Sequence, residues 1–195
     1  MEAFLKLAQF DLQLTLEVVD QFVRVEAQYL GDGHDLGPIV QRGDVFDDLA
    51  RDEELGRMLD WAAALHECGM MVAYNQYHKH GEYIIRNATL GGFSQQEQLL
   101  LAVLVRAHRR RFPVEDISKL PARWGKQATR LAILLRLAVT LNRGRSDAQL
   151  PDFRVSAGKT RITMKIPESW IDFHPLTKAD LASEADYLAA IGYRL

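Results

Sequence analysis

The chain has 195 residues, of which 48% are hydrophobic, and this length and composition allow one or two domains with a substantial buried core. No apolar run is long enough to span a bilayer, and residues 1–6 lack the basic end and cleavage site of a signal peptide, so we expect no membrane partner. The single cysteine, Cys68, excludes an internal disulfide framework and favours a reducing compartment. We therefore expect a cytoplasmic protein.

The formal net charge of −2 conceals a strong segregation of charge along the chain. Residues 1–67 carry 5 basic and 15 acidic side chains, and residues 68–145 carry 13 basic and 4 acidic ones. Residues 146–195 are nearly balanced, with 6 basic and 7 acidic side chains. A basic middle segment steers polyanions toward one face of a protein. The charge pattern alone leaves open that the acidic and basic regions simply pair with each other on folding.

Hydrophobic residues at helical spacing predict helices through the first part of the chain. The first helix is expected to run from a cap at Asp11 to a stop at Gly31, and a polar, acidic loop follows over residues 31–48. The apolar stripe from Leu55 to Leu65 predicts the next helix.

A central helix is predicted by the segment that follows Ser94. Ser94 and Glu97 form a capping box, in which each side chain satisfies a backbone donor of the other residue. The run from Leu99 to Val105 is apolar on almost every side, which is typical of a helix in the middle of a bundle. After a connector bracketed by prolines, the spacing predicts a further helix over residues 128–143.

The periodicity changes near residue 145. Apolar and polar residues alternate within 153–166, which predicts two strands joined by a hairpin loop at residues 156–159. We expect a helical turn at residues 167–170, an amphipathic helix over 181–191 and a last strand at the C-terminal end. The predicted fold class is therefore mainly α with a small α+β unit of the ββαβαβ type.

His66 and Glu67 are the candidates for a metal site. His66 shares the apolar helix face of Ala62, and a helical histidine followed by an acid resembles the pair of the HD-type metal-dependent phosphohydrolases. Such sites hold a divalent metal that lowers the pKa of bound water. The other ligands are missing, because no histidine precedes His34 and Val139 stands where a late aspartate is expected. We expect a degenerate HD pair without metal, in which His66 is a hydrogen-bonded core histidine.

Two groups of basic residues are candidates for binding phosphate. The first contains two histidines near a helix start, where side chains and backbone amides together bind phosphate, and their spacing argues against a two-histidine metal clamp. The second follows a buried helix and is rich in arginine, which binds phosphate in a bidentate manner. A solvated helix entry and a basic helix C-terminus remain open as simpler interpretations. The predicted polyanion-binding residues are His78, Lys79, His80, Arg86, His108, Arg109, Arg110 and Arg111.

From about Trp61 to Arg111 the sequence resembles the C-terminal region of the exopolyphosphatase and guanosine-pentaphosphate phosphatase family. The resemblance depends on the order and spacing of short elements, and it extends nearly to Leu195. The set of His78, His80 and His108-Arg109 resembles the exopolyphosphatase branch. The matching elements are Leu65-His66-Glu67-Cys68-Gly69, His78-Lys79-His80, Tyr83-Ile84-Ile85-Arg86-Asn87, Gly92-Phe93-Ser94 and His108-Arg109.

The resemblance implies an HD-like helical domain over residues 1–145 and a small α+β domain over residues 146–195. It implies a parent exopolyphosphatase, a hydrolase of phosphoric anhydrides whose N-terminal actin-like catalytic domains, with their magnesium, are missing from this chain. We therefore expect no cofactor and no catalytic residue here. The expected function is to bind inorganic polyphosphate, to form a homodimer and to contact the actin-like domains of the same parent protein.

Two other functions remain as alternatives. An autonomous HD-type nucleotide phosphohydrolase would need the metal ligands that the sequence lacks. A nucleic-acid-binding module would use the basic middle segment, but aromatic residues are not interleaved with the arginine cluster as stacking platforms would be. The sequence leaves open whether the parent also acts on guanosine pentaphosphate, and which polyphosphate length it prefers.

Overall fold

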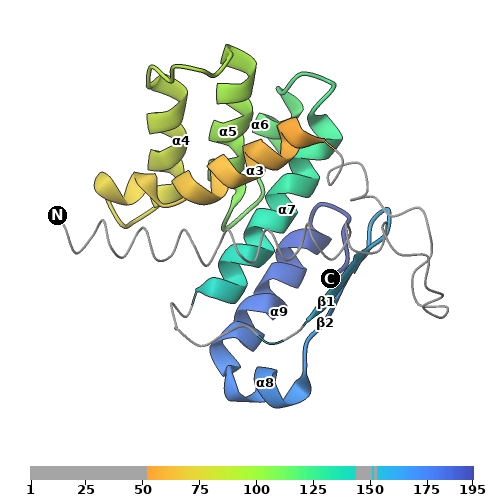
Figure 1. Ribbon diagram of the computed structural model, residues 1–195. Coiled ribbons are helices and arrows are strands. Elements are labelled where there is room, and N and C mark those ends of the chain that lie inside the picture. Colours follow the sequence, from red (N-terminus) through yellow and green to blue (C-terminus); the bar gives the residue numbers. More distant parts are fainter. Residues whose placement is uncertain (1–51, 144–150, 152) are drawn as a thin grey trace.

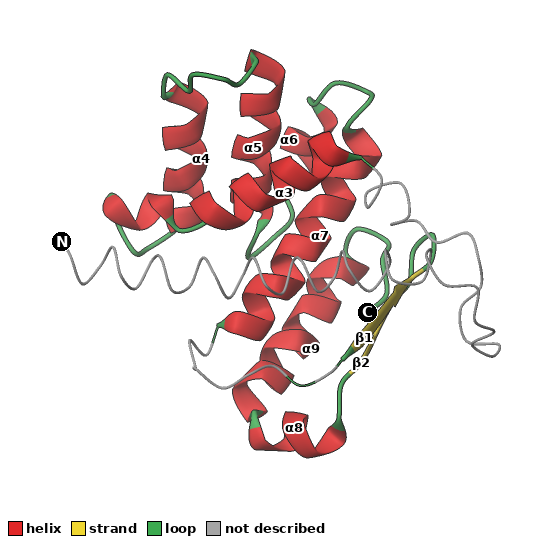
Figure 2. Cartoon of the chain, in the orientation of Figure 1, coloured by secondary structure: helices red, strands yellow, loops and turns green. Residues whose placement is uncertain are grey.

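The computed structural model describes residues 52–143, 151 and 153–195 (Figure 1). The helix expected over residues 11–31 and the acidic loop expected over 31–48 lie outside the described residues. Helices dominate the described part, and a two-stranded sheet lies at one side of it (Figure 2). The prediction of a mainly α protein is confirmed.

Along the described chain the helices of the bundle come first, the two strands follow, and two further helices come last. The elements are α3 (Glu53–Leu65), the 3₁₀ helix η1 (Cys68–Met71), α4 (Tyr77–Asn87), α5 (Gln95–Ala107), α6 (Val114–Ser118), α7 (Gly125–Asn142), β1 (Arg154–Ala157), β2 (Ile162–Lys165), α8 (Glu168–Phe173) and α9 (Pro175–Ala189).

Helix α5 begins with the predicted capping box. The Ser94 hydroxyl accepts a hydrogen bond from the Glu97 backbone N–H at 3.2 Å, and the Glu97 carboxylate accepts one from the Ser94 N–H at 2.7 Å. Asp52 caps α3 in a related way, because its carboxylate accepts from the backbone N–H groups of Glu54 and Leu55. Both helices therefore start where a side chain satisfies otherwise unpaired amides.

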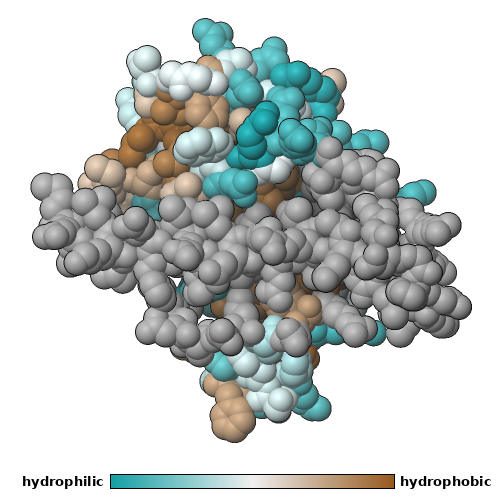
Figure 3. Space-filling model, viewed as in Figure 1, coloured by the Kyte–Doolittle hydropathy of each residue, from teal (hydrophilic) through white to brown (hydrophobic). Residues whose placement is uncertain are grey.

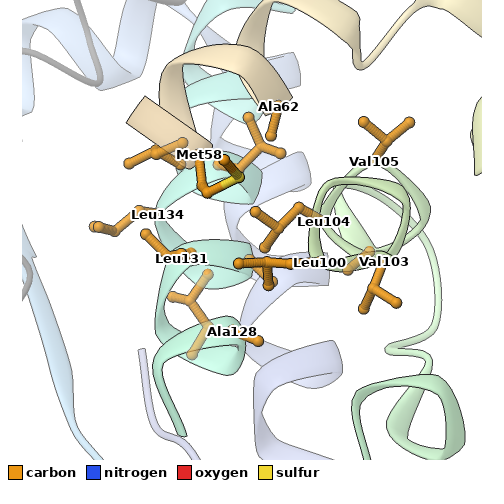
Figure 4. Packing of buried hydrophobic residues seen from close by; sticks show 14 of the residues in the cluster. Met58, Ala62, Leu100, Val103, Leu104, Val105, Ala128, Leu131 and Leu134 are labelled. Atoms are coloured by element: carbon orange, nitrogen blue, oxygen red, sulfur yellow. The ribbon is translucent and has the colours of Figure 1, made fainter. Parts of the chain in front are cut away.

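The core is built around α5, which packs against α3, α4 and α7. Every residue from Leu100 to Val105 is buried, so the helix is covered on all sides, as its apolar run predicts. Figure 4 shows Leu100 and Leu104 directed toward Leu131 of α7, with Met58 of α3 beside them. This packing fixes the direction of α5 and thus the place where its C-terminal end emerges.

Two glycines let η1 and α4 come into close backbone contact. A Cβ atom added at Gly69 would clash with the carbonyl oxygen of Tyr77 and the backbone nitrogen of Gly81. A Cβ atom at Gly81 would lie 2.9 Å from Cγ1 of Val105. The first turn of α4 therefore sits directly on η1 and α5, where no larger residue fits without displacement.

The C-terminal unit differs in detail from its prediction. Strands β1 and β2 form the expected antiparallel hairpin, with Val155 opposite Met164. The ββαβαβ order is not confirmed, because α8 and α9 follow β2 directly and the last strand is reduced to one parallel bridge between Arg161 and Arg194. Pro175 at the start of α9 explains part of this difference, since its fixed φ angle favours a helical first turn.

The C-terminal unit joins the helical bundle through α9. This helix packs along α7 (Figure 1), and ion pairs link the two helices. One of them joins Arg143 to Asp180 at 2.7 Å. Within the unit, the Trp170 ring stacks on the His174 ring with 3.9 Å between their centroids.

The surface of the described residues is mixed in character. Figure 3 shows hydrophobic side chains gathered over α4 and hydrophilic ones over the neighbouring ends of α5 and α6. Trp61 is about half exposed and meets Phe93 edge to face at 5.7 Å. Within the described ranges, no helix combines the length and apolar character that crossing a bilayer requires.

The glycine contact generates a first prediction. Gly69→Ala should lower the free energy of unfolding by about 1–3 kcal/mol, because the new Cβ forces η1 and α4 apart. Gly56→Ala is the matched control, since a Cβ at this position in α3 meets nothing within 4 Å. It should raise the stability by about 0.5–1 kcal/mol through better helix propensity. Urea denaturation measures both, and equal effects of the two variants would contradict the close approach.

Candidate functional site

A half-open cleft of about 570 Å³ lies where the N-terminal end of α4 meets the C-terminal end of α5. Five lysine and arginine side chains line it, and its described walls contain no carboxylate. Such a site favours an anion by electrostatic attraction. The lining residues are Tyr74, Asn75, Gln76, His78, Lys79, Arg106, Arg109, Arg110 and Arg111.

The backbone bends sharply at both walls of the cleft. Gln76 has a φ of 55° and Arg110 has a φ of 63°, and within the described residues these are the non-glycine positions with positive φ. Each left-handed conformation costs on the order of 1–2 kcal/mol for a residue with a side chain. Both costs fall at one cleft, and local strain of this kind is typical of functional sites.

The start of α4 adds a further positive contribution. Gln76 occupies the N-cap position but makes no side-chain capping hydrogen bond. The N–H groups of Lys79 and His80 bond to the Gln76 carbonyl oxygen, as the helix begins to wind. The N-terminal end of a helix carries a partial positive charge and amides that bind anions. This helix end and the cationic side chains therefore favour the same ligand charge.

His78 lines the cleft as a neutral histidine. Its side chain is buried, and burial lowers its pKa to about 4 together with the positive charges of Arg106, Arg109, Lys79 and Arg110. Its Nδ1 atom is buried without a hydrogen-bond partner among the described residues. An ordinary histidine would titrate near pH 6.5, so His78 holds no charge where a sequence-based expectation would give it a partial one.

His108 lies behind the cleft wall and does not line it. Its ring is fully buried and packs 5.2 Å from the His66 ring, 5.3 Å from the Tyr77 ring and 6.3 Å from the His78 ring, between centroids. Its Nδ1–H donates to the Val105 carbonyl oxygen at 2.6 Å. Burial and the neighbouring histidines and Arg109 lower its pKa well below the usual value, so it is neutral and supports the wall.

Tyr77 links this aromatic cluster to the arginines. The guanidinium of Arg109 lies over the Tyr77 ring, 4.5 Å from its centroid. The His108 ring also packs against Tyr77, with an angle of 31° between the two ring planes. A cation held on an aromatic face keeps its charge and loses rotational freedom. Arg109 is thereby oriented before any ligand arrives.

His66 and Glu67 do not form a metal centre with other described residues. His66 is buried, and its Nδ1–H donates to the Ala63 carbonyl oxygen at 2.7 Å, as expected for a core histidine. Val139 is half-buried on α7 at the position where an aspartate was sought. Among the described residues, no group of three or more His, Cys, Asp or Glu side chains could hold a metal ion.

The structure brings together five of the predicted polyanion-binding residues and separates the others. His80 and Arg86 of α4 lie outside the cleft lining, and Arg86 instead pairs with Glu82 at 2.8 Å. His108 lies behind the wall. The five that line the cleft are His78, Lys79, Arg109, Arg110 and Arg111.

Sequence reasoning missed Arg106 and the polar residues of the 74–76 segment. Arg106 lines the cleft and lies one helical turn before Arg109. A basic residue directly after the apolar run of α5 was the available signal, because such a residue must reach the edge of the buried helix. Its guanidinium is 3.3 Å from the Glu82 carboxylate.

Comparison with known proteins identifies a family whose model matches this chain. The family model described as Ppx/GppA phosphatase, domain III, matches residues 34–185. A guanosine-5'-triphosphate,3'-diphosphate pyrophosphatase from Aeromonas hydrophila is 34% identical over 136 residues, and one from Aeromonas salmonicida is 33% identical over 136 residues. One from Pseudoalteromonas translucida is 33% identical over 138 residues.

These alignments cover most of this chain and a small part of each relative. They include 70% of the chain and 27% of the length of the Aeromonas proteins, and 71% and 28% for the Pseudoalteromonas protein. The names of the relatives belong to the nucleotide-phosphatase side of the family. They do not decide the exopolyphosphatase branch, which stays a prediction.

The state of His78 generates a second prediction. Its ring protons should titrate near pH 4 in NMR spectra of the ligand-free chain, because burial and four cations oppose protonation. Since the unfolded chain takes up this proton near pH 6.5, stability should fall as pH falls from about 6.5 to about 4. His78→Gln should reduce that loss. A titration midpoint near 6.5 in the folded chain would show that neither burial nor the neighbouring cations oppose protonation of His78.

Proposed function

Because this chain belongs to the Ppx/GppA phosphatase family, as its domain III, we propose that it is a non-catalytic module that binds inorganic polyphosphate for a parent phosphatase. The basic cleft between α4 and α5 is the observation that carries this proposal. A metal site would point to catalysis, whereas a cleft of positive charges and backbone amides points to holding phosphate groups.

The chemistry of polyphosphate fits the cleft. A phosphate chain presents a line of negative oxygens, and arginine guanidinium groups bind such oxygens through paired N–H donors. Arg109, Arg110 and Arg111 supply such donors at one wall, and Lys79 supplies a flexible ammonium at the other. Each contact neutralises a phosphate and releases a counterion, so binding should weaken as salt rises.

The parent's reaction is part of the proposal. It removes terminal phosphate from polyphosphate, and the names of the relatives favour guanosine pentaphosphate as a further substrate. The catalytic actin-like domains and their magnesium would lie in the part of the relatives' length that the alignment with this chain does not cover. The chain itself contributes the binding cleft and no catalytic group.

Homodimer formation and contact with the actin-like domains also belong to the proposal. Phe173 and Leu176 are more than four-fifths exposed, and apolar side chains of this size favour a surface that another unit covers. We place the protein in the cytoplasm, which suits the free and half-buried Cys68.

Replacing the three consecutive arginines tests the cleft. The variant with Arg109, Arg110 and Arg111 all changed to Ala should bind long-chain polyphosphate at least about tenfold more weakly at low salt, since several charge-assisted contacts are lost. The slope of log affinity against log salt should become smaller by about 2 units. Calorimetry or fluorescence titration at several salt concentrations measures both quantities.

A matched control removes the same charge elsewhere. Lys159, Arg161 and Lys165 are exposed on the hairpin outside the cleft, and changing all three to Ala should leave affinity and salt slope nearly unchanged. Tyr74 is an exposed aromatic at the cleft, so single-stranded nucleic acid should serve as a competitor. Tighter binding of nucleic acid than of polyphosphate at equal charge would favour the nucleic-acid alternative. If the triple-Arg variant binds polyphosphate as tightly as the unmodified chain, the arginine cluster is only a solvated helix end.

The proposal also makes a prediction about turnover. The isolated chain should not release phosphate from polyphosphate or guanosine pentaphosphate, with or without magnesium or manganese, because its described residues hold phosphate-binding groups and no metal-ligating cluster. A phosphate-release assay over hours is sufficient. Turnover that disappears in His66→Ala would establish the autonomous HD-type hydrolase instead.

A further inference from the structure

Arg136 of α7 joins three separate parts of the fold. Its side chain is fully buried and donates from Nε and Nη2 to the two carboxylate oxygens of Glu184 on α9, at 2.7 and 3.0 Å. Its remaining terminal nitrogen, Nη1, donates to the carbonyl oxygen of Ala107 at 2.6 Å. One guanidinium therefore connects α7, the C-terminal unit and the end of α5.

The contact with Ala107 lies at the C-terminal end of α5, the helix that leads into the cleft. Ala107 is the last residue of α5, and the carbonyl groups of a last helical turn have no partner within the helix. A buried cation at this point satisfies one of them and complements the negative end of the helix dipole. The next residues along the chain are His108 and the three arginines.

Arg136 also contacts the residue that follows the C-terminal end of this arginine segment. Its guanidinium carbon lies 4.8 Å from the centroid of the Phe112 ring and 5.3 Å from the centroid of the Tyr187 ring of α9. Phe112 is buried and directly follows Arg111. Residues 108–111 are thus held at both ends by one side chain, through a hydrogen bond to Ala107 and a cation–π contact with Phe112.

We propose that Arg136, oriented by Glu184, is a positioning residue that fixes the arginine segment 108–111 in the cleft, so that the C-terminal unit controls the geometry of the anion site. Arg136 itself does not line the cleft. The strained φ of Arg110 depends on this support, because the chain must reverse within a segment whose two ends are fixed. The effect on polyphosphate rests on the proposed function, whereas the effect on the segment does not.

Glu184→Gln tests the inference with little change in shape. It keeps the side-chain length but removes the charge that orients the guanidinium. In hydrogen–deuterium exchange of the whole chain, amides of residues 108–112 should exchange about tenfold faster, the size expected for one lost charge-assisted hydrogen bond. Polyphosphate affinity should fall about threefold or more, with a smaller salt slope, because the arginines no longer act as a preformed set.

Asp180→Asn is the matched control. Asp180 lies one turn earlier on α9 and also pairs with an arginine of α7, but its partner Arg143 is not in contact with Ala107 or Phe112 in any described interaction. In this variant, the exchange rates at residues 108–112 and the salt slope should equal those of the unmodified chain. Phe112→Leu is a second test variant, which leaves the ion pair intact and removes the aromatic contact at the other end.

The outcomes separate the two proposals. Suppose that residues 108–112 exchange faster in Glu184→Gln but the unmodified chain does not bind polyphosphate. This result would support the positioning role and overturn the proposed function. Uniform loss of protection across the chain, with an unchanged salt slope, would show that the ion pair only stabilises the fold and would overturn the inference. If Glu184→Gln fails to fold, the exchange of residues 108–112 in Phe112→Leu decides, and parental exchange there overturns it.

Discussion

Repulsion among like charges is the constraint on which the candidate site depends. Lys79, Arg106 and the arginines of the 109–111 segment converge on one cleft, and the uncapped end of α4 adds partial positive charge. His78 lies in this environment, and its burial, followed by the positive charges of its neighbours, lowers its pKa to about 4. Charges held together against repulsion gain more from an anion than charges that are free to separate.

The rest of the fold opposes that repulsion. Burial of α5 from Leu100 to Val105 fixes where Arg106 and the following segment emerge, and the glycine contact between η1 and α4 fixes the start of α4. The guanidinium of Arg109 lies over the Tyr77 ring, and the His108 ring packs against the same tyrosine. Hydrophobic packing does not depend on the charges of the site. It therefore supplies the free energy that holds the cationic side chains close together, which a purely polar site would lack.

The sequence predicted what is encoded locally and missed what is encoded by distant contacts. The capping box at Ser94, the buried run of α5 and the basic character of residues 109–111 each depend on neighbours within a few positions. His80 and Arg86 were predicted as binding residues from the helix start and the family resemblance, and in the structure neither lines the cleft. The ββαβαβ order was drawn from alternation and length alone, and neither indicates that α8 passes directly into α9.

The pair of Arg136 and Glu184 shows most clearly what sequence reasoning lacks, because 48 positions separate its members. Burying two charges costs much of what their attraction returns, so such a pair contributes little net stability compared with apolar residues of similar volume. Its value is better explained by direction: the guanidinium fork fits two carboxylate oxygens and one backbone carbonyl in a single orientation. A hydrophobic contact at the same place would hold α7 and α9 together, but it would leave the end of α5 without a partner and the arginine segment without a fixed position.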